Sequence, residues 1–504
     1  MNITKIISSV FFIPRAKIIA SYHHSALEIQ RDQLNRLVSY AKNTEIGKQY
    51  DFANIKKYGD FSKKVPLHSY EDIFPSIKRM MDGEKNVLWP STVRWFAKSS
   101  GTTNDKSKFI PVSKEGLIHC HYAGGRDCIA LYLRNNPQSR IFSGKGLILG
   151  GSLKKSDFSK RYLSGDLSAV MIKNMPFLAN HVRVPCKKIA LMDEWEAKLE
   201  AICNSVIDKN VTNLSGVPSW FLVLIKKILT KTGKSYLTDI WPNLEVFFHG
   251  GISFEPYVEQ YKTLIPSPDM HYMETYNASE GFFGIQNDPD DPSMLLMTDY
   301  GIFYEFIPLE QLNRPDPEIV SLEGVELNRN YATVISTNSG LWRYIIGDTI
   351  KFTSKNPYKF LITGRTKHFI NAFGEELMVH NADKAMVKAC RQTDAVIRDY
   401  TAAPVYMSSE SNGCHQWIIE FERKPDSINY FTECLDSALK EANSDYEAKR
   451  YKNMTLSMPK IVIARENLFH DWLEEKNKLG GQHKVPRLSN DRRYIDELLN
   501  LNSE

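Results

Sequence analysis

Residues 96–111 read FAKSSGTTNDKSKFIP and combine small residues, hydroxyl side chains and lysines in one short stretch. A phosphate-binding loop needs small residues so that backbone N–H groups can reach the oxygens, together with hydroxyls and a cation. A plain solvated loop has a similar composition, so other segments of the chain are needed to decide between a phosphate-binding loop and a solvated one. The Walker A pattern is absent, and the glycines of residues 144–151 lack the GxGxxG spacing of a dinucleotide fold.

Three later segments carry further residue types that suit nucleotide chemistry. YNASEG (276–281) follows a predicted strand, RYIIGD (343–348) lies between two predicted strands, and GRTK (364–367) stands where the residue pattern changes. Carboxylates bind Mg²⁺ or accept hydrogen bonds from ribose hydroxyls, and cationic side chains neutralise phosphate. The four segments together favour a phosphate-binding loop.

The order SSGTT, YNASEG, RYIIGD and GRTK resembles the superfamily of acyl-CoA synthetases, peptide-synthetase adenylation domains and luciferases. Longer stretches resemble one branch, the Gretchen Hagen (auxin-responsive) family of acyl acid amido synthetases. They are SSGTTNDKSKFIPVS, VFFHGGISFEPY, ETYNASEGFFGIQ, YGIFYEFIP, GRTKHFINAFGEEL and NSDYEAKR. The resemblance spans nearly the whole chain and is greater to the family's bacterial members than to the plant hormone enzymes.

The resemblance implies an ATP-dependent ligase that uses ATP and Mg²⁺. The carboxylate of an acid attacks the α-phosphate of ATP and releases pyrophosphate, a reaction that needs positioning and charge neutralisation more than a protein nucleophile. The acyl group then passes to an amine, expected to be that of an amino acid. An acyl-CoA ligase, which passes the adenylate to coenzyme A, shares every motif and is the alternative. A nucleotide-binding protein without catalysis would have lost a phosphate or metal residue, and all are present.

The resemblance also assigns the residues of the ATP site. Phosphates would be held by Ser99, Ser100, Gly101, Thr102 and Thr103, with charge added by Lys106 or Lys108, although Asn104 stands where many members carry glycine. Glu280 would bind Mg²⁺, and Asp348 would accept hydrogen bonds from the ribose hydroxyls. The nucleotide would be lined by Tyr276, Ser279, Gly250 and Gly251, and a tight turn is the alternative for the glycine pair. In RYIIGD, Trp342 precedes Arg343, which departs from the usual spacing and weakens the transfer of Arg343.

The remaining roles concern the developing charge, the movement of the C-terminal domain and the acid. Arg365 would stabilise phosphate or ribose, Lys367 aligns with a hinge, and Lys484 resembles a lysine that the C-terminal domain inserts into the site. Arg126 would clamp a polar substituent of the acid. Trp220 would line the acyl pocket, with core packing as its alternative.

Composition narrows the class of protein. The 504 residues carry a formal net charge of +5 without a long basic block, so we expect neither a nucleic-acid nor a membrane partner. Seven cysteines without a CxxC pair favour a reducing, cytoplasmic location over a disulfide framework or a zinc site. The apolar run IISSVFFI is a weak match to a signal peptide and is better explained as a helix packed on the body.

The pattern of residues predicts the elements that must position these groups. Residues 1–90 predict helices, including 25–44 and 69–84, where Ser69 can cap and Gly83 can end a helix. Strands are predicted at 146–151, 244–251 and 269–276, helices at 114–135 and 193–210, and a denser β region from 295 to 353. Beyond this the expected order is helix 381–392, strand 417–422, helix 427–443, strand 460–465 and a last helix 469–479. The expected fold is α/β, with a large N-terminal adenylate-forming domain (1–366) of layered sheets and helices and a small mobile C-terminal α+β domain (367–504).

Overall fold

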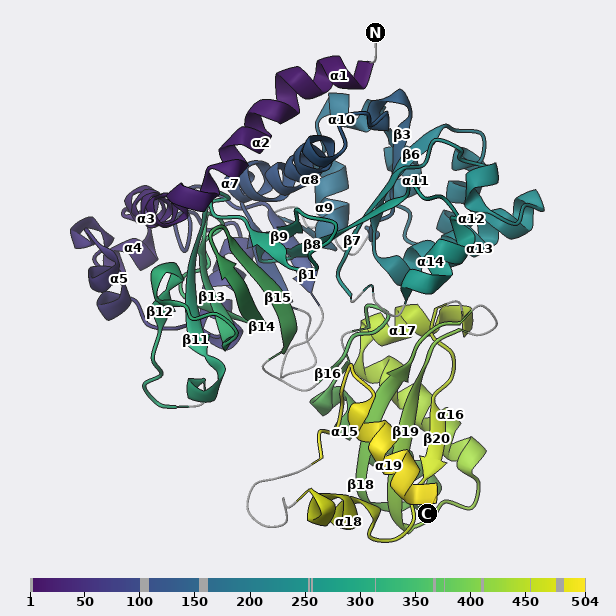
Figure 1. Ribbon diagram of the computed structural model, residues 1–504. Helices are drawn as coiled ribbons and strands as arrows, with labels where there is room; N and C mark the ends of the chain where they lie inside the picture. Colours follow the sequence, from purple (N-terminus) through teal and green to yellow (C-terminus); the bar gives the residue numbers. More distant parts are fainter. Residues whose placement is uncertain are drawn as a thin grey trace.

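The computed structural model describes residues 3–99, 108–153, 162–252, 254, 257–312, 314–365, 369–375, 377–408, 412–453, 455–476 and 485–503. A twelve-stranded mixed sheet with helices forms the body, and a three-stranded sheet with helices forms a smaller part that holds the C-terminus (Figure 1). This confirms the predicted α/β class with a large N-terminal and a smaller C-terminal domain. The predicted boundary between residues 366 and 367 stays a prediction.

One half of the large sheet is parallel and the other is antiparallel. The parallel half runs in the order β8-β7-β6-β3-β5, with β8 (His271–Ala278), β7 (Val246–Gly250), β6 (Val211–Gly216), β3 (Lys145–Ile148) and β5 (Arg183–Val184). The antiparallel half contains β9 (Gly281–Gln286), β10 (Met294–Leu296), β11 (Ile302–Pro308), β12 (Val320–Ser321), β13 (Asn330–Thr337), β14 (Tyr344–Lys355) and β15 (Tyr358–Arg365). Strand β8 joins the two halves because it pairs in parallel with β7 and antiparallel with β9.

Two hydrophobic clusters hold this body together. The first packs Leu34, Ile77 and Leu131 of three helices against strands of the antiparallel half, and the second packs Ile202 and Ile225 against the parallel half. The sequence predicts one of these helices closely, since Ser69 caps α6 and Gly83, with φ +91°, follows it. The helices before β5 are α3 (Tyr22–Ala41), α4 (Glu45–Gln49), α5 (Tyr58–Lys64), α6 (Tyr70–Met81), α7 (Lys114–Gly116), α8 (Tyr122–Asn135), α9 (Leu167–Asn174) and α10 (Phe177–His181). Those after it are α11 (Lys187–Ala190), α12 (Trp195–Val206), α13 (Pro218–Thr232) and α14 (Val258–Leu264).

The chain begins with a bent helix that lies along the top of the body in Figure 1. It consists of α1 (Ile3–Ile7), a π-helical turn η1 (Ser8–Phe12) and α2 (Ile13–Ala20). Arg15 fixes it by donating hydrogen bonds to Asp127 of α8 at 2.8 Å and to Asp299 at 2.6 Å. The predicted packing of this helix on the body is therefore confirmed. No helix among the described residues is long and apolar enough to cross a membrane.

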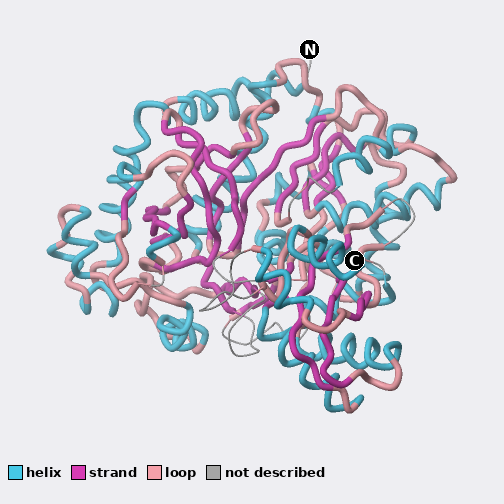
Figure 2. Tube along the Cα trace, turned by 60° about the horizontal axis from the view of Figure 1, so that its bottom comes forward, coloured by secondary structure: helices cyan, strands magenta, loops and turns pink. Residues whose placement is uncertain are grey.

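The C-terminal part is a small sheet of β18 (Val396–Val405), β19 (Cys414–Arg423) and β20 (Lys460–Ile463) with helices around it (Figure 2). The predicted helices and strands are present as β19, β20, α15 (Val379–Thr393), α16 (Ile428–Ala442) and α18 (Leu468–Glu475). The prediction was incomplete, because it omitted β18 and a final helix, α19 (Arg493–Ser503). The remaining elements are β16 (Phe369–Ile370), β17 (Leu377–Met378) and α17 (Ser444–Arg450), and Figure 1 shows α17 at the end of the C-terminal part that is nearest the body, below α14.

Candidate active site

A cavity of about 2150 Å³ lies where the parallel strands of the large sheet end. The residues that follow β6 and β7 line it, as does the turn after β8, and α17 of the C-terminal part contributes to its wall. Ligands of open α/β sheets bind at such strand ends and at points where the topology changes. The volume exceeds that of an ordinary small-ligand site, so the cavity has room for a nucleotide together with a second substrate.

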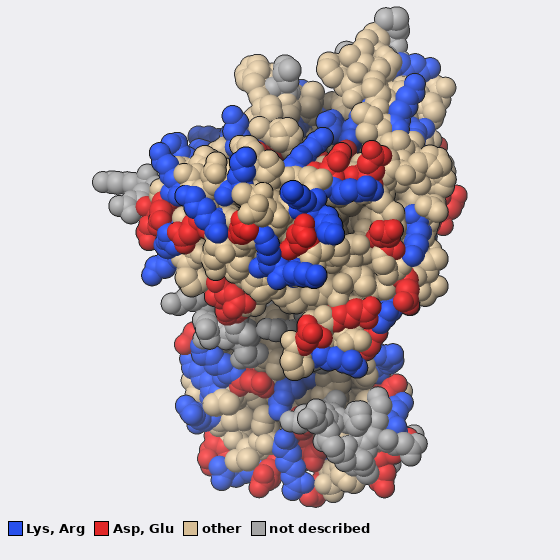
Figure 3. Space-filling view, turned by 90° about the vertical axis from the view of Figure 1, so that its left-hand side faces the viewer, with Lys and Arg blue, Asp and Glu red and all other residues tan. Residues whose placement is uncertain are grey.

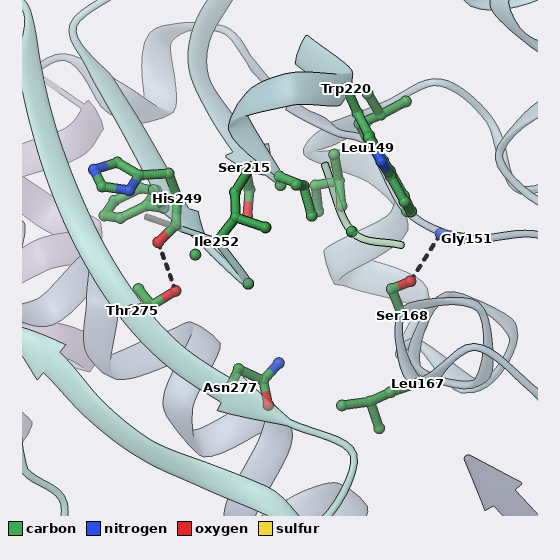
Figure 4. Close-up of a pocket in the computed structure, with 18 of the residues that line it drawn as sticks. Leu149, Gly151, Leu167, Ser168, Ser215, Trp220, His249, Ile252, Thr275 and Asn277 are labelled. Carbon is green, nitrogen blue, oxygen red and sulfur yellow. Dashed lines mark hydrogen bonds between the residues drawn. The ribbon is translucent and has the colours of Figure 1, made fainter. Parts of the chain in front are cut away.

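Many of the residues predicted for the site line this one cavity. Figure 4 shows Trp220, Gly151 and Ser168 on one side and His249, Thr275 and Asn277 facing them. The predicted residues that line it are Ser99, Arg126, Trp220, Gly250, Gly251, Tyr276, Ser279, Glu280 and Asp348. Ser100, Gly101, Thr102, Thr103, Lys106, Lys367 and Lys484 lie outside the described residues. The roles of all these residues stay predictions.

The SSGTT loop joins two strands of a hairpin. Strand β1 (Trp95–Ser99) pairs antiparallel with β2 (Lys108–Val112), and Ser99 is opposite Lys108. A third strand, β4 (Leu163–Gly165), pairs in parallel with β1. Lys108 does not line the cavity: its Nζ lies 3.4 Å from the hydroxyl of Tyr344 and 5.6 Å from the ring centre of Tyr70. The hairpin therefore holds both ends of the loop, but Lys108 contacts the body of the protein.

Glu280 and Ser279 form the tight turn between β8 and β9, where Ala278 is paired with Gly281. Both turn residues line the cavity. Glu280 also lies near the SSGTT hairpin: burial chiefly raises the pKa of Tyr70 to about 12, and the charge of Glu280 adds to that rise. Tyr70 in turn accepts a hydrogen bond from the backbone N–H of Phe109 in β2 at 2.8 Å. The carboxylate of Glu280 therefore lies near the β1–β2 hairpin, although the two are far apart in the sequence.

Asp348 owes its position to a bulge in β14. Val334 pairs with Ile345 while Ala332 pairs with Thr349, so extra residues are accommodated between them on β14. Gly347 within this bulge has φ +95°, a left-handed conformation that favours glycine. The carboxylate of Asp348 accepts a hydrogen bond from the hydroxyl of Tyr276, and its backbone is paired with that of Arg365 in β15. The bulge therefore brings together YNASEG, RYIIGD and the backbone of Gly364 and Arg365, the first two residues of GRTK.

The glycine pair of HGG has a structural reason of its own. A Cβ on Gly250 would lie 2.2 Å from the carbonyl oxygen of Thr275 in the neighbouring strand β8. Gly251 has φ +84°, so the chain turns away from the sheet there. A tight turn beside a closely packed strand is therefore sufficient to explain both glycines.

Arg343 does not face the cavity, although it begins the RYIIGD motif. It is buried, and its guanidinium forms an ion pair with Glu305 of β11 at 2.9 Å. It also donates hydrogen bonds to the carbonyl oxygens of Ser62 at 3.0 Å and Val65 at 2.6 Å. Arg343 thus links α5 to the sheet, which makes it a structural residue of this motif.

Two residues predicted for the acid have different settings. Arg126 lines the cavity from α8, and its Nε donates to Asp127 at 2.7 Å. Trp220 lies at the start of α13, and its ring faces the cavity. The Nζ of Lys449 from α17 lies over this ring, 3.9 Å from the ring centre. Core packing alone does not describe Trp220, because it forms part of the wall between the two parts of the chain.

Sequence reasoning missed several ionisable groups on the cavity wall, among them His249, Glu274 and Lys449. Burial lowers the pKa of His249 to about 3, and its ring stacks on Phe254 at 4.1 Å. Burial raises the pKa of Glu274 to about 7, and it lowers the pKa of Lys449. His249 and Glu274 occupy predicted strands and Lys449 belongs to NSDYEAKR, but only the fold reveals that they share a cavity.

Glu274 gives a prediction for the pH dependence of stability. The unfolded chain releases this proton near pH 4.5, whereas the folded chain retains it to about pH 7. The group therefore lowers stability as the pH rises through this window. The Glu274→Gln variant cannot ionise at this position. We therefore expect the difference in free energy of unfolding between the variant and the unsubstituted protein to shift in favour of the variant by about 1 to 2 kcal/mol from about pH 5 to about pH 8. Denaturant unfolding at the two pH values measures this, with the exposed Glu259→Gln as the control; a difference that does not change with pH would contradict it.

Three sequence models of one family match successive parts of the chain. The GH3 family N-terminal domain matches residues 15–270, the GH3 family central domain matches 295–365 and the GH3 family C-terminal domain matches 380–493. Among curated proteins, the 4-substituted benzoates-glutamate ligase GH3.12 of Arabidopsis thaliana is 24% identical, over 85% of this chain and 87% of the relative. The jasmonoyl–L-amino acid synthetase JAR6 of Nicotiana attenuata is 23% identical, over 91% and 90%.

Two solved structures show the same fold. The GH3.15 acyl acid amido synthetase superposes with a TM-score of 0.62 at 18% identity, covering 97% of this chain and 96% of that chain. A 2-hydroxyisobutyryl-CoA ligase superposes with a TM-score of 0.55 at 14% identity, covering 97% and 92%. The overall arrangement is therefore common to proteins named for amide formation and for thioester formation.

Proposed function

The chain belongs to the GH3 family, and we propose that it is an ATP-dependent ligase that joins a carboxylic acid to the amine of an amino acid. The three family matches confirm the predicted family, while the predicted bacterial branch stays a prediction. The relatives over most of its length are named as ligases or amido synthetases, which supports an amide product over a thioester. The observation that carries the proposal is that Ser99, Tyr276, Glu280 and Asp348 line one cavity.

In the first step, a carboxylate oxygen of the acid forms a bond to the α-phosphorus of ATP, and pyrophosphate leaves. The loop 99–103 would hold the phosphates, Asp348 the ribose hydroxyls, and Arg365 the charge that develops on the phosphate. Tyr276 supports this by fixing one side of the Asp348 carboxylate through its hydroxyl. In the second step the amine nitrogen bonds to the acyl carbon, the nitrogen gives up a proton and AMP leaves. Lys367 would be the hinge between the two steps, and Lys484 the inserted lysine that neutralises developing charge.

Glu280 fits a magnesium site by its chemistry and its position. It is a carboxylate on the cavity wall and lies close to the hairpin that carries the phosphate-type loop. Mg²⁺ is commonly held by one or two carboxylates and by phosphate oxygens. A bound Mg²⁺ would neutralise phosphate charge, and Glu280 would hold it.

Lys449 suits recognition of the acceptor. Its ammonium group is partly buried at the wall between the two parts of the chain and lies over the face of Trp220. The described residues form no ion pair with it within 4 Å, although the charges of Asp445, Asp166 and Glu375 act on it from further away. A cation in such a setting can bind a carboxylate. We therefore assign Lys449 to the carboxylate of the acceptor amino acid, while Arg126 and Trp220 stay assigned to the acid.

The experiment for the proposed function separates the two half-reactions. Each of a panel of carboxylic acids is tested for acid-dependent exchange of labelled pyrophosphate into ATP, and the active acids are then offered with amino acids or with coenzyme A. We expect exchange with at least one acid and an amide product with an amino acid. A thioester without any amide, or no exchange with any acid, would contradict the proposal.

Lys449→Met should weaken binding of the acceptor without affecting adenylation. We expect the KM for the amino acid to rise about 10- to 100-fold, because a charge-assisted hydrogen bond is lost, while pyrophosphate exchange keeps its rate. Lys388→Met, at an exposed lysine paired with Glu441, is the matched control. An acceptor whose carboxylate is replaced by an amide should respond little to Lys449→Met. An equal fall in pyrophosphate exchange would remove Lys449 from the acceptor role.

A further inference from the structure

The N-terminal helix exposes large apolar side chains on the face that points away from the body. Thr4, Ser8, Ala16 and Ile19 are buried against the protein. Other positions of the helix are exposed: Phe11 is 66% and Val10 59% exposed, and three isoleucines extend this surface, namely Ile6, Ile13 and Ile18. A helix that is already packed on one side and still exposes a row of apolar side chains on the other has a second surface to cover.

Helix α10 extends this surface. Phe177 is 74% exposed and Val182 is 49% exposed. The two segments are neighbours: Phe12 stacks on Phe142 with ring centres 5.4 Å apart, and Gly146, a few residues further along, donates a hydrogen bond to the carbonyl oxygen of Val182 at 2.9 Å. We call the set of Ile6, Val10, Phe11, Ile13, Ile18, Phe177 and Val182 the apolar face.

The two segments that carry the apolar face lack acidic residues. Residues 1–27 contain no Asp or Glu, and residues 167–192 contain none either. Lys5 and Lys17 are exposed on the N-terminal helix, and Lys188 is exposed after α10. Figure 3 shows tan and blue atoms at the upper end of the molecule, whereas below this end red atoms are interspersed with blue ones. The small net charge of the whole chain therefore hides a local excess of positive charge.

The exposed apolar side chains and the nearby lysines together distinguish between the possible binding partners of the apolar face. A second copy of the chain, paired face to face about a two-fold axis, would set the apolar face against itself and bring lysines against lysines. An anionic lipid surface complements both features, because apolar side chains enter the acyl boundary while lysines meet the headgroups. The face is also continuous with the interior, since Phe12 and Val182 line the cavity.

We propose that the apolar face docks the protein on an anionic lipid surface, with the N-terminal helix lying in the plane of the headgroups. The expectation of no membrane partner rested on the net charge of the whole chain. The proposal differs because it considers the lysines and the exposed apolar side chains of this one surface. The inference can be tested independently of the ligase activity, because Val10 and Phe177, the two residues substituted below, do not line the cavity. Arg15, paired with Asp127 and Asp299, keeps the helix attached to the body while its outer side contacts lipid.

The test is sedimentation of the full chain with vesicles of phosphatidylcholine alone and with vesicles that also contain phosphatidylglycerol. We expect binding to the anionic vesicles that weakens as salt is added. Val10→Asp should lower the partition coefficient about tenfold, since it places a like charge among the headgroups. Phe177→Asp should act in the same direction from a different segment. Val387→Asp, a valine 51% exposed on α15 of the C-terminal part, is the matched control and should bind as the unsubstituted protein does.

The outcomes separate this proposal from its alternatives. Far-UV circular dichroism and thermal unfolding should be unchanged in Val10→Asp because the side chain is exposed, so a loss of binding reports the surface. The proposal would be overturned if Val387→Asp and Val10→Asp lost vesicle binding equally, or if the unsubstituted protein did not bind anionic vesicles. A dimer in sedimentation velocity that Val10→Asp converts to monomers while vesicles remain unbound would also overturn it, since a second copy would then be the occupant.

Discussion

Replacing Glu280 by Gln is expected to lower acid-dependent pyrophosphate release by about 10²- to 10³-fold, while the protein stays folded. Glu280 lies in a tight turn on the cavity wall, beside the hairpin that carries the phosphate-type loop. The amide keeps the size of the side chain but loses the charge with which a carboxylate holds Mg²⁺. Pyrophosphate release measured over a range of Mg²⁺ concentrations gives the result, and the variant should need more Mg²⁺ to reach half of its maximal rate.

Glu323→Gln, at an exposed acid far from the cavity, is the control for the removal of one negative charge. Its rate and its Mg²⁺ dependence should match those of the unsubstituted protein. An unchanged rate in Glu280→Gln, with an unchanged Mg²⁺ requirement, would remove Glu280 from the metal role. The proposed ligase activity would survive that result, because pyrophosphate release would still depend on the acid.

Replacing Arg343 by Met is expected to destabilise the protein by about 3 to 5 kcal/mol, because it leaves a charge buried without its partner. Arg343 and Glu305 are 3% and 1% exposed, and Tyr58 adds a hydrogen bond of 3.0 Å to the same carboxylate. Burial raises the pKa of Glu305 even while Arg343 is present. Without Arg343 the folded protein should hold Glu305 protonated, so the loss of stability should become smaller as the pH falls towards about 5. Denaturant unfolding at neutral and mildly acidic pH measures both effects.

Arg329→Met gives the comparison for this pair. Arg329 lies at the surface, where its ion pair with Glu310 is solvated, and its loss should cost less than about 1 kcal/mol. If Arg343→Met cost as little, the buried pair would not hold α5 to the sheet in the way the structure implies. If it instead reduced activity while leaving stability unchanged, Arg343 would belong to the ATP site after all.

Elements whose signals are local could be predicted from the sequence. Ser69 and Gly83 mark the two ends of α6, and the strands that lead into Gly150, Gly250 and Tyr276 were found from their apolar runs. Strand β18 was missed because Arg398, Asp399 and Pro404 break its apolar pattern, and it is defined mainly by pairing with β19. Helix α19 was missed although Ile495 and Leu498 have helical spacing, because their apolar side faces a cluster that forms only in the folded C-terminal part.

The residues of the candidate site also fall into those with a local sequence signal and those defined by contacts between remote segments. The motif order identified the segments around Glu280 and Asp348, since each is a short sequence with a recognisable chemistry. The spacing of RYIIGD already weakened the transfer of Arg343, but its partner Glu305 could not be identified because it is distant in the sequence and carries no motif. Lys449 could not be found from NSDYEAKR, because its character depends on Trp220, a residue of another helix. Contacts between remote segments are the part that pattern reasoning cannot supply.

Strand β8 sets a limit on how this chain can vary in length. Alternate side chains of a strand point to opposite sides, so Tyr276, which bonds Asp348, and Asn277, which contacts His121, take their directions from one count of residues. Deleting or inserting one residue within β8 would exchange those directions and would displace the Ser279–Glu280 turn at the same time. Loops elsewhere can gain or lose residues one segment at a time. In β8, by contrast, one count of residues sets the directions of several cavity side chains at once. A substitution within β8 is therefore tolerated far more readily than an insertion or a deletion.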